Sequence, residues 1–444
     1  MLTRSGYVIP LSKKDQVKSD LTVRPLAAEG YPQPPSFQVY RVGKSLCVPR
    51  FYGEQKFGEP EEDTRPEPAR ASIKFVGKLK DETCQNEALK KALEAGHGVL
   101  SLPCGYGKTT VALALSAKLG YRTMIIVHKE FLAHQWRERI EQFCPGSTIG
   151  RIQRDTCDVQ HDFVIAMLQS LTLKEYKFDA FESFGTVIVD EAHHICAQVF
   201  SQALFKICPR HLYGLSATPD RKDGLTKVLN WFMGPTFFSV ARKDQTQVEV
   251  FTVDFDHSGP LPLNRCGKVS LVNMITELVE NDDRNKLLVK TIKKIGKNRK
   301  VLVLSDRRNH CEVLHSHFKD LGGLYMGGMS RDALEETSKK QIIFGTFSQA
   351  HEGLDIPTLD TVILATPKSD IQQSIGRILR ETPGKQNNPH IYDIKDNWNY
   401  ILTSMYKKRL GVYRSGQFTI HGYEEEVPVI PKGVMLFKII QEKR

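Results

Sequence analysis

A glycine-rich loop between an apolar run and a helix-forming stretch holds the first residues that could do chemistry. The run is Gly98–Leu102, the stretch is Thr109–Leu119, and the loop consists of Pro103, Cys104, Gly105, Tyr106, Gly107, Lys108, Thr109 and Thr110. Glycines let backbone N–H groups turn toward a phosphate, and a helix N-terminus adds a favourable field. Lys108 would therefore reach the β- and γ-phosphates of a nucleotide, and the Thr109 hydroxyl would bind Mg²⁺. A leucine replaces the first glycine of the usual phosphate-loop pattern, so an ordinary loop is the alternative, but the order of strand, loop and helix favours a nucleotide site.

Two adjacent carboxylates, Asp190 and Glu191, follow the apolar run Thr186–Val189. Placing two carboxylates at the end of a buried strand is costly unless a cation is present. Asp190 would hold Mg²⁺, and Glu191 would align and activate an attacking water molecule. The alternative is a pair that caps the next helix. The loop at Lys108 in the same chain makes the metal site the better interpretation.

Two more strings could take part in the same chemistry. Ser216-Ala217-Thr218-Pro219 follows a further apolar run, and its hydroxyl groups could hydrogen-bond the loop of the paired acids and relay the state of the nucleotide. By itself this string would be a turn before a helix. Arg377 and Arg380 lie three residues apart, so on a helix they share a face and could stabilise charge on a γ-phosphate. An isolated pair of this kind would be two surface arginines.

The elements that must position these residues alternate between short β-branched runs and helical stretches. The expected strands are Gly98–Leu102, Thr123–Val127, Phe163–Met167, Thr186–Val189 and Leu212–Ser216, and the expected helices include Thr109–Leu119 and Lys129–Phe143. Apolar runs without alternation predict strands buried on both faces, and alternating strands and helices predict a parallel sheet. Such a sheet presents its chemistry at the carboxyl ends of its strands, where the unusual residues fall.

A second α/β region follows the first. A helix over Val272–Ile295 is expected before a strand at Val301–Leu304, with further strands at Gln341–Phe344 and Thr361–Ala365. The N-terminal residues predict a small β-rich or irregular element with strand-like pieces at Phe37–Arg41 and Ser45–Phe51, followed by a Pro/Glu linker; a solvated arm over residues 53–70 is the alternative. The predicted organisation is an N-terminal extension (1–70), a first lobe (71–240), a strand-rich connector (241–268), a second lobe (269–420) and a C-terminal tail (421–444).

Composition restricts the class of protein. Of 444 residues, Lys and Arg number 62 and Asp and Glu 51, a net charge of +11 that favours a polyanionic partner such as nucleic acid. Clusters at Lys293–Lys294, Lys297–Lys300 and Lys407–Arg409 could bind phosphates or be solvated surface. No apolar run approaches the ~18 residues of a membrane span, and the N-terminal residues lack the apolar core expected of a secretory signal. Nine scattered cysteines predict neither a zinc site nor a disulfide framework. A soluble, intracellular protein, in the nucleus, cytoplasm or a virion, is expected.

The four strings, in this order, resemble the superfamily 2 helicases: GYGKT is similar to motif I, DEAH to motif II, SATP to motif III and QSIGRILR to motif VI. This resemblance implies two RecA-like domains with parallel sheets that face each other across an ATP cleft. It also implies that Gln85 reads the adenine edge, although Cys84 stands where the family has an aromatic residue. Gly353 and Asp355 are implied to bind nucleotide, and Ser216, Ala217, Thr218 and Gln373 to couple the nucleotide to movement.

The same resemblance implies contacts with the backbone of a nucleic acid. In the first lobe these contacts come from a segment similar to motif Ia and from a later segment, Ala166–Ser170, that is similar to a second backbone-contacting motif of that lobe. In the second lobe they come from segments similar to motifs IV and V. The implied residues are His128, Lys129, Gln135, Gln169, Ser170, Arg307, Thr346 and Ser348.

Within the superfamily the chain resembles the XPB-like and UvsW-like DNA translocases and their relatives in phages and large DNA viruses. The strings that carry this resemblance are Leu102–Lys108, Arg221-Lys222-Asp223, Gly376–Arg380 and Val48–Gly53. The implied activity is that of an ATP- and Mg²⁺-dependent helicase or translocase on DNA, expected to act as a monomer, with accessory proteins left open. The alternatives are an RNA-remodelling or transcript-releasing ATPase, a helicase-like binder without activity, and the motor half of a nuclease system.

Overall fold

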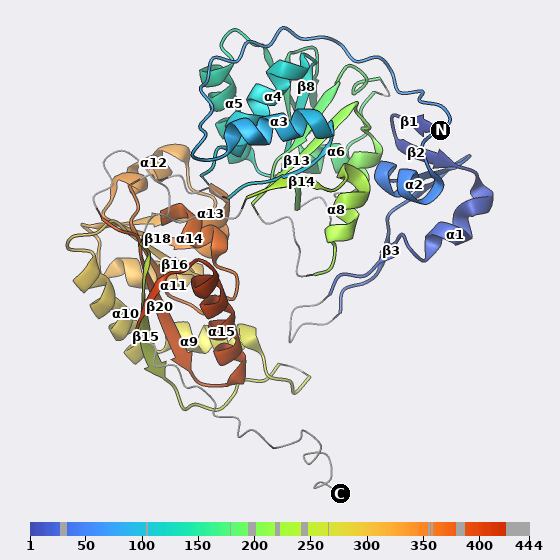
Figure 1. Cartoon of the computed structure of the whole chain (residues 1–444). Helices are drawn as coiled ribbons and strands as arrows, with labels where there is room; N and C mark the ends of the chain where they lie inside the picture. The colour runs from blue at the N-terminus through green and yellow to red at the C-terminus, as the bar shows by residue number, and fades with distance from the viewer. Residues whose placement is uncertain are drawn as a thin grey trace, which may run out of the picture.

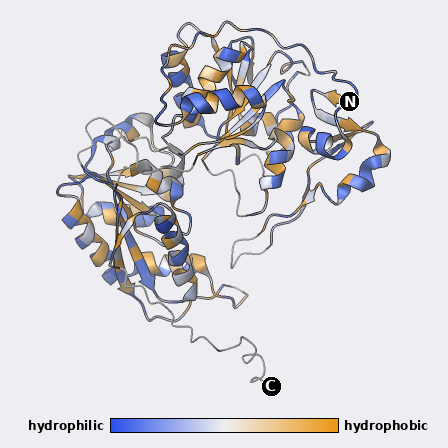
Figure 2. Cartoon of the chain, viewed as in Figure 1, coloured by the Kyte–Doolittle hydropathy of each residue, from blue (hydrophilic) through white to orange (hydrophobic). Residues whose placement is uncertain are grey.

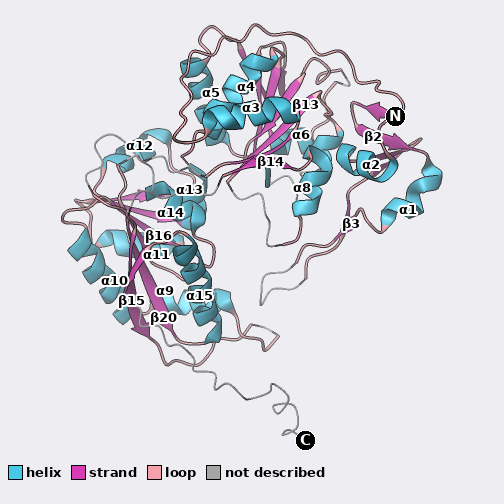
Figure 3. Cartoon of the chain, in the orientation of Figure 1, coloured by secondary structure: helices cyan, strands magenta, loops and turns pink. Residues whose placement is uncertain are grey.

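A computed structural model gives the structure of the chain. It describes residues 1–26, 33–103, 105–177, 179–193, 201–217, 223–240, 247–264, 266–353, 356, 358–378 and 387–422, without the side chains of residues 331, 351–353, 373 and 377. Figure 1 shows two α/β units that follow each other along the chain, with a smaller N-terminal element beside the first. In Figure 3 the strands form the middle of both large units and the helices lie around them.

The first lobe is built on an eight-stranded sheet in the order β10-β9-β11-β8-β12-β13-β7-β14. Neighbouring strands are parallel except for the hairpin of β9 and β10. All five strands expected in this region are confirmed, within one residue at either end. The strands are β7 (Gly98–Ser101), β8 (Thr123–Val127), β9 (Ile149–Gln153), β10 (Thr156–Asp158), β11 (Phe163–Met167), β12 (Thr186–Val189), β13 (His211–Ser216) and β14 (Thr236–Ser239).

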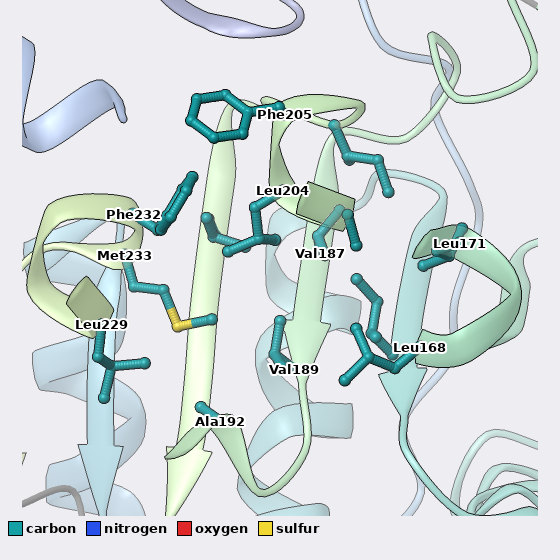
Figure 4. Packing of buried hydrophobic residues seen from close by; sticks show 14 of the residues in the cluster. Leu168, Leu171, Val187, Val189, Ala192, Leu204, Phe205, Leu229, Phe232 and Met233 are labelled. Carbon is teal, nitrogen blue, oxygen red and sulfur yellow. The ribbon is translucent and has the colours of Figure 1, made fainter. Parts of the chain in front are cut away.

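Both faces of this sheet are buried, as the unalternating apolar runs predict. The helices of the lobe are α3 (Gln85–Ala95), α4 (Lys108–Leu119), α5 (Glu130–Phe143), α6 (Leu168–Leu173) and α8 (Thr226–Met233). α4 and α5 cover one face, and α6 and α8 contribute to the core on the other. Figure 4 shows Val187 and Val189 of β12 packed between residues of α6 and α8, and Figure 2 shows the apolar strands inside more hydrophilic helices. The core therefore fixes the strand ends that carry the candidate site.

The second lobe is built on a seven-stranded parallel sheet in the order β17-β18-β16-β19-β20-β15-β21. The strands are β15 (Glu249–Asp256), β16 (Val301–Ser305), β17 (Gly322–Tyr325), β18 (Ile342–Thr346), β19 (Thr361–Leu364), β20 (His390–Asn397) and β21 (Thr419–His421). Its helices are α9 (Leu271–Glu280), α10 (Asp282–Ile295), α11 (Arg308–Ser316), α12 (Arg331–Lys339), α13 (Phe347–Gly353), α14 (Gln372–Ile378) and α15 (Tyr400–Ser415). The α/β class, with two sheets rich in parallel pairs, is confirmed.

Two features of the second lobe correct the expectations from sequence. The helix expected over Val272–Ile295 is two helices, because Asn281 adopts an extended backbone and its side chain accepts a hydrogen bond from the N–H of Arg284, which starts α10. Part of the expected connector, Glu249–Asp256, is the strand β15, which pairs with β20 and β21 of the second sheet. The second sheet therefore begins earlier in the chain than residue 269.

The N-terminal element is a four-stranded sheet in the order β1-β2-β6-β5, formed by β1 (Leu2–Thr3), β2 (Gly6–Ile9), β6 (Leu46–Val48) and β5 (Arg41–Val42). A separate pair joins β3 (Thr22–Val23) and β4 (Phe37–Gln38), and the short α1 (Lys14–Lys18) lies between β2 and β3. The strand expected up to Phe51 is wrong at its end, because Pro49 precedes the helix α2 (Arg50–Phe57). This helix packs against α8 of the first lobe, where the Tyr52 and Trp231 rings meet edge to face with 5.6 Å between centroids.

The segment after α2 is not a freely solvated arm. Hydrogen bonds from Arg65 to the Pro209 carbonyl and from the Ala69 N–H to the Ser183 carbonyl attach it to the first lobe. None of the described helices is both long and apolar enough to cross a membrane.

A buried ion pair joins two elements of the second lobe. The guanidinium of Arg284 on α10 donates to both carboxylate oxygens of Asp396 on β20, at 2.7 and 2.9 Å, and to the Ala365 carbonyl at 2.7 Å. Both side chains are 1% exposed or less. Because Ala365 follows β19, this pair fixes the start of the segment that leads to α14.

Asp396→Ala is expected to destabilise the protein by about 3–5 kcal/mol, because it leaves the Arg284 charge buried without its carboxylate. Urea unfolding followed by circular dichroism would measure the change. Asp283→Ala, which removes an exposed ion pair with Lys286, is the matched control and should leave the unfolding curve unchanged. Equal curves for the two variants would contradict a structural role for the buried pair.

Candidate nucleotide site and nucleic-acid interface

The candidate residues of the first lobe lie along one edge of its sheet. β11, β8, β12, β13 and β7 are consecutive, parallel neighbours, so their carboxyl ends meet at the same edge. In that order the residues at these ends are Gln169 and Ser170, then His128 and Lys129, then Asp190, then Ser216, and last the loop with Lys108. The expected nucleic-acid contacts therefore occupy one half of the edge, and the expected nucleotide residues occupy the other half.

The glycine loop has the conformation that its sequence demands. Gly105 and Gly107 have φ of +89° and +78°, and α4 begins at Lys108 directly after them. A Cβ atom on Gly107 would collide with the side-chain amide of Gln85, so a larger residue would have to displace Gln85 in addition to adopting a strained backbone. The Lys108 ammonium donates to the carbonyls of Leu102 at 2.8 Å and Pro103 at 3.4 Å, at the mouth of the loop. Thr109 and Thr110 lie half-buried in the first turn of α4, and Cys104 falls outside the described residues.

Gln85 supports this loop directly. Its side chain is 5% exposed; the amide oxygen accepts from the Lys80 N–H at 3.0 Å, and the amide nitrogen donates to the Tyr106 carbonyl at 3.0 Å. In this structure both polar atoms of Gln85 are bound to backbone. The arrangement assigns Gln85 a role in holding the loop, and its contact with an adenine remains a prediction.

The paired acids lie at the end of β12. One oxygen of Asp190 accepts from the Glu191 N–H at 3.0 Å, and the other accepts from the indole N–H of Trp136 at 2.9 Å. Burial, and then the charge of Glu191, raises the pKa of Asp190 to about 6. Glu191 itself has φ of +47°, a left-handed conformation that is uncommon for this residue type and typical of strained functional positions.

These groups fit a divalent cation. The carboxylates of Asp190 and Glu191 are neighbours in a partly buried site, and the raised pKa of Asp190 reflects the cost of holding its charge there. Within the described part of the chain, Oε2 of Glu191 is buried and accepts no hydrogen bond, and its neighbour there is Nδ1 of His193 at 3.5 Å. A hard cation prefers oxygen ligands, and the hydroxyl of Thr109 and the carboxylate of Asp190 are of that kind. The residues present are therefore the ones that Mg²⁺ would need.

Ser216 connects the neighbouring strand to this loop. It is fully buried at the end of β13, and its hydroxyl lies 3.3 Å from Nδ1 of His193, which is 3.5 Å from a carboxylate oxygen of Glu191. A path of close contacts therefore joins Ser216 to the acids, as the coupling hypothesis requires. Ala217 follows Ser216 and is half-buried, whereas Thr218 falls outside the described residues.

The remaining first-lobe candidates differ in exposure. His128 and Ser170 are 7% and 8% exposed, and the Ser170 hydroxyl accepts from the Arg154 N–H at 2.9 Å, so the Ser170 side chain supports the backbone here. Gln169 donates to the His128 carbonyl at 2.6 Å, which joins the ends of β11 and β8. Lys129 and Gln135 are half-buried at the start and in the body of α5. Their contacts with nucleic acid remain predictions.

The second lobe places its candidates at adjacent strand ends. Arg307 follows β16 and donates to the Val272 carbonyl at 3.0 Å. Thr346 ends β18, the neighbour of β16, and its hydroxyl lies 3.2 Å from that of Ser348, which is exposed. Arg307 and the two hydroxyl groups thus follow the ends of neighbouring parallel strands of the second sheet.

The helix α14 carries the expected arginine and glutamine. Ile371, Ile375 and Ile378 anchor it in the core of the second lobe. The side chains of Arg377 and Gln373, and the whole of Arg380 and Asp355, lie outside the described residues, and Gly353 is described only as the last residue of α13. The structure therefore locates the helix of the arginine pair but not the guanidinium groups.

Sequence reasoning missed two residues near the candidate site. Trp136 bonds to Asp190 across 54 positions of the chain, a pairing that local pattern cannot reveal. Arg409, counted among the surface clusters, is 2% exposed; it binds Asp393 at 2.8 Å and the Lys368 carbonyl at 2.9 Å, in the segment before α14. Its burial between α15 and β20 corrects the solvated interpretation of that cluster.

Comparison with known proteins agrees with this geometry. Residues 78–221 match the family model of the type III restriction enzyme, res subunit. A protein of Acanthamoeba polyphaga mimivirus, named as a candidate ATP-dependent RNA helicase, is 33% identical over 95% of this chain and 86% of its own length. A candidate helicase of invertebrate iridescent virus 6 is 30% identical over 80% of this chain and 84% of its own. An African swine fever virus protein, named as a candidate ATP-dependent RNA helicase, is 26% identical over 70% of this chain and 67% of its own.

The similarity to these viral proteins spans both lobes. The chain belongs to the superfamily 2 helicases, together with helicases of large DNA viruses. It is an ATP-dependent helicase enzyme that binds nucleic acid.

Proposed function

We propose that this helicase is a DNA translocase that hydrolyses ATP between its two lobes and steps along the phosphate backbone. One observation carries the proposal: the strand order puts the glycine loop, Ser216 and the paired acids at neighbouring positions, with the expected nucleic-acid residues on the next strands of the same edge. A change in the bound nucleotide can therefore be transmitted to the nucleic-acid contacts through adjacent strand ends.

Each nucleotide-site residue has a proposed role. Gly105, Gly107 and the first turn of α4 direct backbone N–H groups at the phosphates, and Lys108 turns its ammonium from the loop carbonyls to the β- and γ-phosphates. Mg²⁺, held by Thr109 and Asp190, neutralises charge on these phosphates when bound. Glu191 orients the attacking water and accepts its proton.

The second lobe completes the site in this proposal. Arg377 and Arg380 gain a partner only when α14 approaches the γ-phosphate, so ATP binds the closed arrangement more tightly than the open one. Hydrolysis removes that partner and releases the second lobe. Alternate closing and opening would move the contacts at Arg307, Thr346 and Ser348 relative to those at Lys129 and Gln135 along the strand.

The proposal that the track is DNA depends on the sequence resemblance to the XPB-like and UvsW-like translocases. Two of the viral relatives are named as RNA helicases, so RNA is the specific alternative. ATP turnover with single-stranded, duplex and branched DNA, and with RNA of equal length, compared at fixed salt, tests the choice. We expect DNA to stimulate turnover more than RNA, with binding that weakens as salt rises and does not depend on sequence. Stimulation by RNA alone would overturn the DNA assignment.

Glu191→Gln is expected to bind ATP with unchanged affinity but to hydrolyse it at least about 10²-fold more slowly, because the amide cannot accept the proton of the attacking water. Equilibrium binding of a fluorescent ATP analogue, together with single-turnover hydrolysis, would separate the two effects. Glu182→Gln, a half-buried position of the same lobe paired with Arg4, is the control. Rapid hydrolysis by Glu191→Gln would exclude the proposed role.

A further inference from the structure

Trp136 is a buried aromatic residue whose only polar atom is directed at the candidate metal site. The side chain is 2% exposed in the core of the first lobe, and the indole N–H donates to Asp190 at 2.9 Å. A hydrogen bond to a carboxylate is stronger than one between neutral groups. The other Asp190 oxygen is held by the N–H of its own neighbour, Glu191, so Trp136 is the distant group that sets the orientation of this carboxylate.

The helix that carries Trp136 also carries candidate contacts with nucleic acid. α5 begins directly after Lys129, and Gln135 precedes Trp136 in the chain. The helix packs against β8, β11 and α4, and its buried residues Trp136 and Ile140 lie in the core beneath it. Because α5 is a single helix of 14 residues, a shift at Lys129 or Gln135 moves the donor atom of Trp136 with it.

We propose that Trp136 is a positioning residue that couples the occupancy of the nucleic-acid face of α5 to the orientation of Asp190, and so to the affinity for Mg²⁺. This inference rests on the proposed function in two respects, the role of Asp190 as a metal ligand and the contacts of Lys129 and Gln135 with nucleic acid. Nucleic acid on α5 stabilises the position in which the indole N–H meets the carboxylate. Mg²⁺ binding and nucleic-acid binding are then linked, each favouring the other.

The test is Trp136→Phe in the full-length protein, because phenylalanine keeps a buried aromatic ring at this position and removes the indole N–H together with part of the ring volume. The measurement is calorimetric titration of Mg²⁺ into the complex with a non-hydrolysable ATP analogue, with and without single-stranded DNA. Loss of a group that orients a metal ligand typically weakens metal binding 10–100-fold. We expect a weakening of at least about 10-fold in Mg²⁺ affinity, loss of the enhancement by DNA, and unchanged analogue affinity without Mg²⁺.

Two controls make the outcome specific. Trp231→Phe alters the half-buried tryptophan that packs on Tyr52 and should keep wild-type Mg²⁺ affinity. Asp190→Asn should lose most Mg²⁺ affinity; if it does and Trp136→Phe does not, the coupling inference fails while the proposed function stands. If Asp190→Asn keeps wild-type Mg²⁺ affinity, the metal assignment fails and the inference fails with it. Equal losses of analogue affinity with and without Mg²⁺ in Trp136→Phe would indicate a disturbed core and would also overturn the inference.

Discussion

Lys108→Ala is expected to lower the rate of ATP hydrolysis by on the order of 10³ or more, while leaving the affinity for nucleic acid largely unchanged. The ammonium group lies at the mouth of the glycine loop, and its removal takes away the positive charge that this loop would present to the β- and γ-phosphates. The nucleic-acid candidates lie at other strand ends, so their contacts do not depend on Lys108. Steady-state phosphate release and fluorescence anisotropy with labelled DNA would measure the two effects.

The matched control for this prediction is Lys118→Ala, which removes an exposed lysine from the last turn of the same helix. It should retain wild-type turnover, which separates the loss of one charge on α4 from the loss of the phosphate contact. Wild-type turnover in Lys108→Ala would refute the assignment of the phosphate-binding loop.

Arg377→Ala is expected to reduce turnover by on the order of 10³, the effect typical of a missing arginine finger. The reason is that charge develops on the γ-phosphate in the transition state, and the proposed site has this guanidinium as its contribution from the second lobe. ATP affinity should change far less, because the first lobe supplies the contacts to the ground state. Single-turnover hydrolysis and equilibrium nucleotide binding would distinguish the two.

For this variant the control is Arg414→Ala, an exposed arginine in the last turn of α15 in the same lobe. Its turnover should match that of the wild type. An Arg377→Ala protein with normal turnover would show that the second lobe does not complete the site.

The parallel strands that were predicted are short, unalternating apolar runs that end at a polar or glycine-rich segment. Thr123–Val127, Phe163–Met167 and Thr186–Val189 agree with the structure at both ends. The stretch that holds β15 is strand-rich in sequence, but its place in the second sheet was not predictable, because that place depends on pairing with β20 and β21, which lie far away in the chain. The break between the two helices at Asn281 was not predictable either. It depends on one side-chain hydrogen bond, and the apolar pattern continues through both helices.

The same distinction between local and distant interactions separates the site residues that could be predicted from those that could not. The glycine loop and the paired acids are local strings, and their chemistry can be inferred from residue type and from the strand before them. Trp136 and Arg409 act through partners that only the folded chain brings near, Asp190 in one case and the Lys368 carbonyl in the other. Sequence pattern carries no record of such pairs, because a buried tryptophan or arginine has the same neighbours in the chain whether or not it bonds to a distant group.

The central claim is that one ATP is held jointly by the glycine loop of the first lobe and by α14 of the second. A crystal structure of the protein with single-stranded DNA, Mg²⁺, ADP and a fluoroaluminate mimic of the γ-phosphate tests it most directly. The account predicts that the mimic lies within about 3 Å of both the Lys108 ammonium and the Arg377 guanidinium. A mimic bound at the loop with Arg377 far from it, in a complex that includes DNA, would contradict the account.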